Sequence, residues 1–165
     1  MSRASPPVTA YVGLGANLAD PPAQIRSAID ALRQLPGTTL GRVSSLYRSA
    51  PLGYADQPQY INAVAEVHTM LPARTLLESL LEVEARHGRV RPFANAPRLL
   101  DLDLLIYGDE VRDEPGLQLP HPRMHERRFV LEPLCEVAPE STIPGRGPAR
   151  DWLARTAGQQ VERLR

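Results

Sequence analysis

Lysine is absent from this chain of 165 residues, so all 19 of its basic residues are arginine. Without lysine, the chain cannot use a Walker A phosphate loop, which needs its lysine, and it cannot form a Schiff base. Any phosphate that it binds must be held by arginine, by backbone amides or by a metal ion. The 19 basic residues are balanced by 19 acidic ones, so the basic excess of a dedicated nucleic-acid-binding protein is missing too.

Cysteine and long apolar runs are also scarce. Cys135 is the single cysteine, which excludes an intrachain disulfide and a cysteine-rich zinc site and fits a reducing compartment. No apolar run approaches the roughly 18 residues of a membrane span, and the first residues lack the apolar core of a secretory signal. We therefore expect a cytoplasmic protein with no membrane partner. The length and the 42% of hydrophobic residues predict one domain over residues 1–165.

Hydrophobic periodicity predicts alternating strands and helices in the first two thirds of the chain. We expect strands at residues 8–14, 38–47, 60–69 and 99–107, and helices at residues 22–35 and 72–87. This order predicts an α+β, ferredoxin-like fold, an antiparallel sheet with helices packed on one face. A C-terminal helical appendage should follow, with helices at residues 127–135 and 149–164. The other sheet face and the loops at 49–58 and 88–97 are the expected ligand site.

Asp101 and Asp103 alternate with leucines in the strand expected at residues 99–107, which we expect to lie inside the sheet. Side chains two residues apart on a strand point to the same face. Two adjacent carboxylates repel each other unless a cation lies between them, and ligation by oxygen alone favours Mg²⁺. The alternative is an exposed strand face on which arginine pairs with the aspartates.

The segment directly before the aspartates is rich in arginine. Residues 86–98 contain Arg86, Arg89, Arg91 and Arg98 and no acidic residue. Guanidinium groups beside a bound Mg²⁺ are typical of polyphosphate sites, and a flexible loop could close over such a substrate. The alternative is a solvated charged loop.

Two weaker patterns add little to the prediction of function. His121 and His125 have the spacing of zinc ligands on a helix, but Pro122 lies between them and no third ligand is close in sequence. Gly13 and Gly15 match half of a dinucleotide-binding fingerprint, whose third glycine is replaced by Leu18. We interpret these two glycines as part of a tight turn.

Six blocks in chain order carry a resemblance to a known family. They are YVGLGANL (11–18), SSLYRSAPLG (44–53), DQPQYINA (56–63), EARHGRVR (84–91), PRLLDLD (97–103), and PH (120–121) with RRF (127–129). Together they resemble the 6-hydroxymethyl-7,8-dihydropterin pyrophosphokinases of folate biosynthesis, from about residue 11 to residue 140. The resemblance implies a ferredoxin-like enzyme that transfers the β,γ-pyrophosphoryl group of ATP to the pterin hydroxymethyl group and releases AMP.

The resemblance also implies a role for each matched residue. Asp101 and Asp103 would hold two Mg²⁺ ions and, with Arg89 and Arg91 of a mobile loop, carry the catalysis. The residues implied for ATP are Glu84, Arg91, Arg98, His121 and Arg127. The residues implied for the pterin are Ser49, Ala50, Leu52, Tyr60, Asn62 and Phe129, with the amide on the ring edge and the phenyl ring on its face.

Some positions depart from the family pattern. Asn95 stands where many members have tryptophan, in a loop that is one residue shorter. Pro122 replaces a common aromatic residue, and Gly116 lies where some members have a basic one. These changes bear on nucleotide affinity and rate more than on the type of reaction.

Two other functions stay open at this point. A non-catalytic, ferredoxin-like module that binds RNA would need aromatic residues on its central strands, where only Tyr11 and Tyr60 qualify. A family member that binds pterin without catalysis is the second. The favoured prediction is a monomeric, Mg²⁺-dependent pyrophosphokinase whose partners are ATP and the pterin, not nucleic acid.

Overall fold

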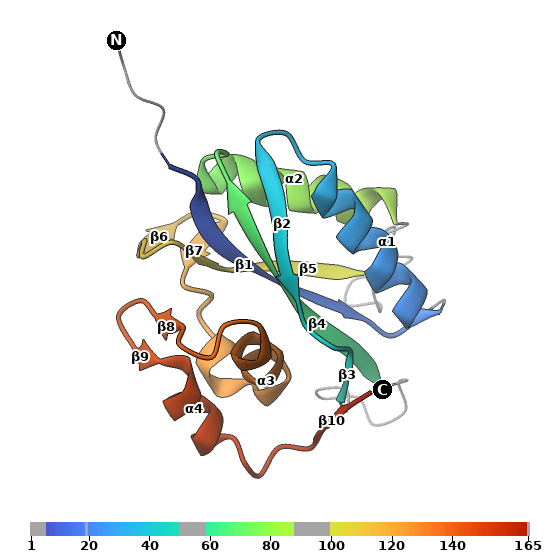
Figure 1. Cartoon of the computed structure of the whole chain (residues 1–165), viewed down its shortest axis with the longest axis vertical. Coiled ribbons are helices and arrows are strands. Elements are labelled where there is room, and N and C mark those ends of the chain that lie inside the picture. Colours follow the sequence, from blue (N-terminus) through green and yellow to red (C-terminus); the bar gives the residue numbers. More distant parts are fainter. Residues whose placement is uncertain (1–5, 19, 50–58, 88–99, 165) are drawn as a thin grey trace.

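In the computed structural model, the chain builds a central β-sheet with helices against both of its faces (Figure 1). The structure describes residues 6–18, 20–49, 59–87 and 100–164. The elements in chain order are β1 (Val8–Ala16), α1 (Pro21–Arg33), β2 (Thr38–Val43), β3 (Tyr47–Ser49), β4 (Tyr60–Thr69), α2 (Ala73–Arg86), β5 (Asp101–Tyr107), β6 (Arg112–Glu114), β7 (Leu117–Leu119), the short 3₁₀ helix η1 (Met124–Glu126), α3 (Arg128–Val137), β8 (Thr142–Ile143), β9 (Gly147–Pro148), α4 (Ala149–Arg155) and β10 (Val161–Arg163).

The central sheet is antiparallel at every strand pair that the described residues form. Its strand order is β10-β3-β4-β1-β5. β2 also pairs with β4, at residues 65–69, whereas β3 pairs with residues 60–62. The long strands β1 and β4 therefore form its centre. The predicted antiparallel sheet with helices is confirmed, while the more detailed ferredoxin-like assignment stays a prediction.

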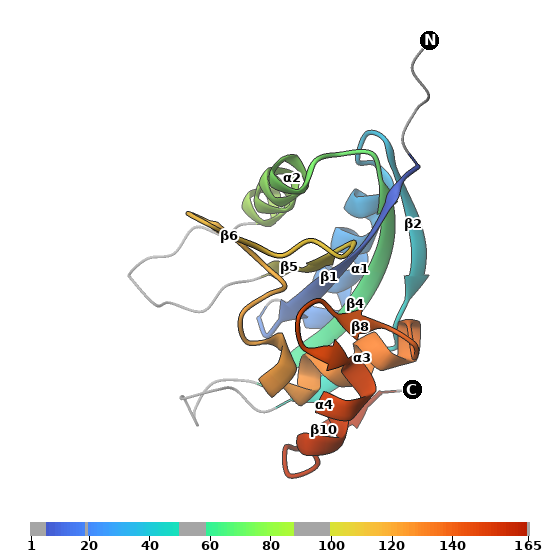
Figure 2. The same cartoon turned by 90° about the vertical axis from the view of Figure 1, so that its left-hand side faces the viewer.

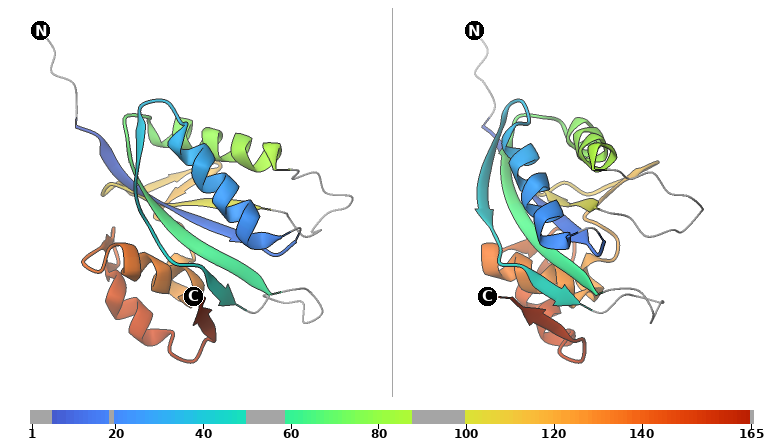
Figure 3. Two further views of the ribbon diagram at one scale, coloured as in Figure 1. Left: turned by 45° about the vertical axis from the view of Figure 1, so that its right-hand side comes forward. Right: turned by 90° about the vertical axis from the view of Figure 1, so that its right-hand side faces the viewer.

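The first face of the sheet is covered by α1 and α2 (Figure 3). In α1 the Asp20 carboxylate accepts the Ala23 N–H at 3.4 Å, and the apolar residues recur at helical spacing and point inward. α2 buries its own apolar stripe in the same way. The helices and the sheet share a buried apolar cluster that includes Ala10 and Val12 of β1. Because alternate side chains of a strand point to opposite faces, the residues between them point to the second face.

The second face is partly covered by the C-terminal segment, in which η1, α3 and α4 pack below the sheet (Figure 2). Val64 of β4 and Leu105 of β5 meet Met124, Leu131 and other apolar residues of this segment in a second buried cluster. The predicted appendage is thus a layer on the sheet. It covers the part of this face that lies beside the site described below.

Several predicted elements differ from the structure. The strand expected at residues 38–47 is divided into β2 and β3, and the hairpin β6–β7 was missed. The last helix ends at Arg155 instead of continuing to residue 164, because the Thr156 hydroxyl donates to the Leu153 carbonyl at 2.8 Å and β10 then pairs with β3.

Two predictions that concern the site were wrong. β5 lies at the edge of the sheet and not inside it. Gly13 and Gly15 lie within β1, so they form no tight turn, because both neighbouring strands pair along this segment.

Candidate active site

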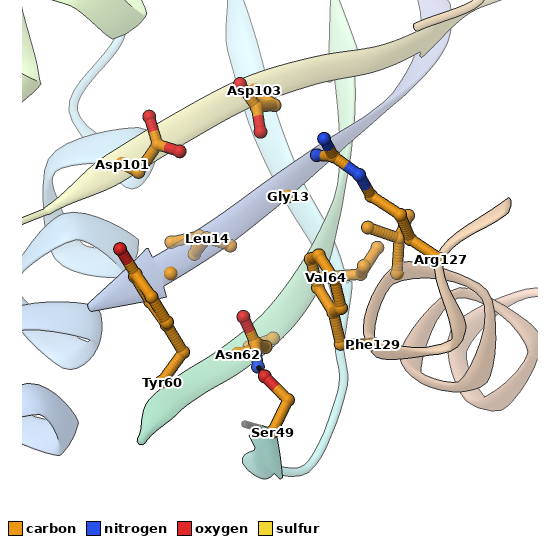
Figure 4. Close-up of a pocket in the computed structure, with 13 residues that line it drawn as sticks. Gly13, Leu14, Ser49, Tyr60, Asn62, Val64, Asp101, Asp103, Arg127 and Phe129 are labelled. Carbon is orange, nitrogen blue, oxygen red and sulfur yellow. Dashed lines mark hydrogen bonds between the residues drawn. The ribbon is translucent and has the colours of Figure 1, made fainter. Parts of the chain in front are cut away.

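Asp101 and Asp103 both project from β5 toward the second face of the sheet. Leu102 and Leu104, which alternate with them, are buried in the cluster on the first face. This arrangement is the one that the period-two pattern predicts. The two carboxylates therefore lie on the face that α1 and α2 leave free (Figure 4).

Glycine separates these carboxylates from the next row of side chains. Across β1, Asp101 is opposite Gly15 and Asp103 is opposite Gly13. On the other side of β1, Gly15 is opposite Asn62 and Gly13 is opposite Val64 of β4. Because the two glycines have no side chain, they leave a channel between the carboxylates on β5 and the residues on β4.

This channel is the base of a pocket, which we call the first pocket. Residues of β1, β3, β4, β5 and α3, and the residue directly before α3, line it. They are Gly13, Leu14, Gly15, Ser49, Tyr60, Asn62, Ala63, Val64, Asp101, Asp103, Arg127, Phe129 and Val130.

The polar side of the first pocket is held in place by a buried hydrogen bond. The Asn62 side-chain N–H donates to the Ser49 hydroxyl at 2.7 Å, and both residues are more than nine-tenths buried. This contact fixes the amide with its oxygen on the side of Gly15, where an added Cβ would lie 3.4 Å from Asn62 Oδ1. The pocket therefore presents a preoriented acceptor beside a flat channel.

Aromatic and cationic groups face that amide from the beginning of α3. Figure 4 shows Phe129 beside Val64 and the Arg127 side chain directed toward β5. The Arg127 guanidinium lies 5.6 Å from the centre of the Phe129 ring. An apolar ring, a polar amide and a cation thus surround a narrow space, as suits a flat heteroaromatic ligand.

A second pocket lies on the other side of the aspartates. Its lining comes from α2, β5, the β6–β7 hairpin and the segment that follows the hairpin. It includes Leu77, Leu81, Glu84, Gly116 and His121. Asp101 and Asp103 line both pockets, so the two carboxylates mark the place where the pockets meet.

Glu84 and His121 are held in different ways within the second pocket. The buried Glu84 carboxylate accepts the Leu102 N–H at 2.7 Å, which satisfies a donor on the outer edge of β5. His121 accepts the Arg123 N–H on Nδ1 at 3.2 Å. Burial, helped by the charge of Arg127, lowers the pKa of His121 and favours the neutral ring.

The donors at the junction of the pockets suit Mg²⁺. Asp101 and Asp103 supply carboxylate oxygens, and they line the first pocket together with Gly13 and Gly15. Among the described residues, no group of three or more histidine, cysteine, aspartate or glutamate side chains could hold a metal. Further ligands would therefore come from water and from a ligand's own oxygens, as is usual for Mg²⁺ beside phosphates. Of the two histidines at zinc-ligand spacing, His125 packs edge-on against Trp152, with the ring centroids 4.9 Å apart.

The structure brings together most of the residues that the sequence singled out. Ser49, Tyr60, Asn62, Arg127 and Phe129 line the first pocket with the two aspartates. The predicted Ala50, Leu52, Arg89, Arg91 and Arg98, together with Asn95, lie outside the described residues.

Sequence reasoning missed the parts of the pocket that depend on strand pairing. The roles of Gly13, Gly15 and Val64 follow from the register of β1 with its two neighbours. The glycine-x-glycine spacing, which puts both glycines on one strand face, was the signal that could have found them.

Of the two aromatic residues that the RNA-binding alternative would use, Tyr60 lines the first pocket and Tyr11 is partly buried. The Tyr11 hydroxyl donates to Glu66 at 3.1 Å, and its ring packs against the second cluster. Burial and this hydrogen bond raise the pKa of Tyr11 to about 12. This hydrogen bond ties the Tyr11 hydroxyl to Glu66, the residue opposite Tyr11 on β4.

Comparisons with known proteins identify relatives of this chain. The model of the 7,8-dihydro-6-hydroxymethylpterin-pyrophosphokinase family matches residues 11–139. The chain is 46% identical over 154 residues to the 2-amino-4-hydroxy-6-hydroxymethyldihydropteridine pyrophosphokinase of Pseudomonas aeruginosa, covering 93% of this chain and 95% of the relative. It is 45% identical over 157 residues to the protein of the same name from Haemophilus influenzae, covering 95% and 98%.

Solved structures show the same fold. A chain described as HPPK-DHPS in complex with substrates superposes with a TM-score of 0.72 at 11% identity, covering 93% of this chain and 44% of that chain. The Plasmodium falciparum HPPK-DHPS with pterin and p-hydroxybenzoate gives a TM-score of 0.71 at 12% identity, covering 96% and 43%. The present chain thus spans less than half the length of these two solved chains. None of its helices within the described residues is long and apolar enough to cross a membrane.

Proposed function

Because this chain belongs to the 7,8-dihydro-6-hydroxymethylpterin-pyrophosphokinase family, it is an ATP-dependent diphosphotransferase of folate biosynthesis, and we propose that its two pockets form the active site. The observation that carries the proposal is the position of Asp101 and Asp103, which line both pockets. One pocket suits a flat ring and the other a nucleotide. The reacting groups of two substrates would then meet at the carboxylates.

The pterin binds in the first pocket. Its ring lies over the channel at Gly13 and Gly15, with Phe129 against its face and the Asn62 amide at its edge. The Asn62 oxygen, held by the Ser49 contact, accepts from a ring N–H. Tyr60 lies at the side of the pocket, and Ala50 and Leu52 complete our assignment for the pterin.

ATP, the co-substrate of the family, binds in the second pocket with its phosphates toward the aspartates. His121 and Arg127 contact phosphate, and Glu84 keeps β5 in place beside the nucleotide. Arg89, Arg91 and Arg98 bring further guanidinium groups to the phosphates, since lysine is absent from the chain.

Asp101 and Asp103 would hold two Mg²⁺ ions, which would neutralise phosphate charge and help to orient the reacting groups. The pterin hydroxyl oxygen attacks the β-phosphorus of ATP and loses its proton to water, the bond from that phosphorus to the α-phosphate oxygen breaks, and AMP leaves. The chain itself contributes position and charge: the first pocket holds the hydroxymethyl group, and the arginines stabilise the transferred group.

The remaining assignments concern the protein as a whole. We propose that residues 1–165 act as one pyrophosphokinase domain, as a monomer in the cytoplasm. Size-exclusion chromatography with light scattering tests the monomer directly.

The reaction is tested by measuring AMP release from ATP and Mg²⁺, with and without 6-hydroxymethyl-7,8-dihydropterin. We expect AMP only when the pterin is present. Asp103→Asn keeps the size of the side chain but removes its charge, so turnover should fall by about a hundredfold or more. Asp30→Asn, on the exposed surface of α1, is the matched control and should behave as wild type. Full activity of Asp103→Asn would contradict the assigned metal site.

A further inference from the structure

The segment between β2 and β3 contains one more residue than the strand opposite it. Val43 is opposite Ala65 and Tyr47 is opposite Asn62, so three residues of this segment face two residues of β4. An extra residue of this kind is a β-bulge, which leaves one backbone N–H without a partner in the ladder and turns the strand that follows. Here that strand is β3, which carries Ser49.

Ser44 and Ser45 satisfy this bulge in two different ways. The Ser44 N–H donates to the Val64 carbonyl, and the Ser44 hydroxyl oxygen accepts the Val64 N–H, each at 2.9 Å. The Ser45 N–H instead donates to both carboxylate oxygens of Glu136, at 3.0 and 3.1 Å. Glu136 lies in α3, so a helix supplies the partner that the sheet does not.

The Glu136 carboxylate also accepts from three side chains around the bulge. The Tyr47 hydroxyl donates at 2.6 Å, the Ser45 hydroxyl at 3.0 Å, and the Arg163 guanidinium of β10 at 3.4 Å. Burial alone would raise the pKa of Glu136, but the hydrogen bonds from Tyr47 and Ser45 outweigh it and lower the pKa. The carboxylate therefore stays charged, and its bonds are of the stronger, charge-assisted kind.

The bulge controls which residues of β3 face the first pocket. Tyr47 and Ser49 are buried and Arg48 is exposed, and a slip of one residue would exchange these faces. Ser49 is the residue that holds the Asn62 amide. The same helix α3 carries Phe129 at its other end, so Glu136 connects the aromatic side of the pocket to its amide side.

We propose that Glu136 is a positioning residue for pterin recognition, which holds the β2–β3 bulge so that Ser49 meets Asn62 at a fixed distance from α3. This inference rests on the proposed binding of the pterin in the first pocket. Glu136 lines neither pocket, so it acts through Ser45, Tyr47 and β3.

The decisive variant is Glu136→Gln. An amide NH₂ in place of either carboxylate oxygen faces the Ser45 N–H or the Arg163 guanidinium, which cannot accept. We expect KM for the pterin to rise about tenfold, whereas kcat and KM for ATP should change less than about twofold. Glu132→Gln, one turn earlier on α3 and paired with Arg128, is the matched control and should leave all three constants unchanged.

Circular dichroism would detect whether Glu136→Gln folds. If it does not fold, a second variant tests the same inference. Tyr47→Phe removes only the 2.6 Å hydrogen bond and should also raise KM for the pterin without lowering kcat. An unchanged pterin KM in the folded Glu136→Gln protein, or in Tyr47→Phe if the first variant does not fold, overturns the inference. A wild-type protein that releases no AMP in the presence of pterin contradicts instead the proposed function.

Discussion

At the scale of single residues, the most informative position in the site is one without a side chain. Gly15 separates Asn62 from Asp101, and its backbone has no positive φ that would require glycine. The space above it is therefore the reason for glycine here. Gly15→Val should fold but fill the channel, and we expect pterin affinity to fall about tenfold or more, which equals about 1.4 kcal/mol. Calorimetric titration with the pterin measures this directly.

Gly158→Val is the matched control for that substitution. Gly158 lies in the turn after α4, has no atom within 4 Å of an added Cβ, and lines neither pocket. We expect its pterin affinity to equal that of wild type. If Gly15→Val binds the pterin as tightly as Gly158→Val does, the ring does not lie over the channel.

At the scale of elements, the two buried clusters should differ in their effect on function. Leu32 of α1 and Leu131 of α3 are both fully buried, in the first and the second cluster. Truncating either to alanine leaves a cavity and should lower the free energy of unfolding by about 2–5 kcal/mol. Only α3 carries Phe129, so Leu131→Ala should also raise KM for the pterin, whereas Leu32→Ala should not. Urea unfolding and steady-state kinetics give both quantities, and an equal pterin KM in the two variants would contradict this role of α3.

The same scale shows what the sequence could and could not predict. The patterns of β1, β4, α1, α2 and β5 are local, because each has an apolar face with the period of its own element. β10 was missed because it exists through pairing with β3, more than a hundred residues earlier in the chain, and its own three residues carry no strand pattern. The β6–β7 hairpin had a usable signal in Pro115 and Gly116, whose φ of 76° suits a tight turn.

For the site, the period-two spacing predicted Asp101 and Asp103 on one strand face, and the structure agrees. The same spacing argument puts Gly13 and Gly15 on one strand face, but the residues opposite them and the role of Glu136 could not be predicted in this way. Both depend on register, in one case across three strands and in the other between a bulge and a helix. Which residues lie opposite one another in the sheet has no local sequence signal.

At the scale of the whole molecule, stability should depend on pH through a histidine at the junction of η1 and α4. His125 is 8% exposed, packs edge-on against Trp152, and has Glu126 at 3.5 Å. Burial, together with the charge of Arg146, lowers the pKa of His125 below its ordinary value of 6.5. The unfolded chain therefore binds a proton more readily than the folded one as pH falls through 6.5. The free energy of unfolding should fall over this window, as linkage requires.

His125→Gln removes this titration and isolates it from the carboxylates, which also titrate in acid. We expect the difference in free energy of unfolding between wild type and His125→Gln to be constant above about pH 7.5, where the ring is neutral in both states. Below pH 6.5 the wild type should lose stability faster than the variant, because only the wild type carries a buried ring that must stay neutral to remain folded. Urea unfolding at intervals between pH 8 and pH 5 gives the two curves. Parallel curves over the whole range would mean that His125 has the same pKa in the folded and unfolded chain, and that the junction with Trp152 does not exclude the charged ring.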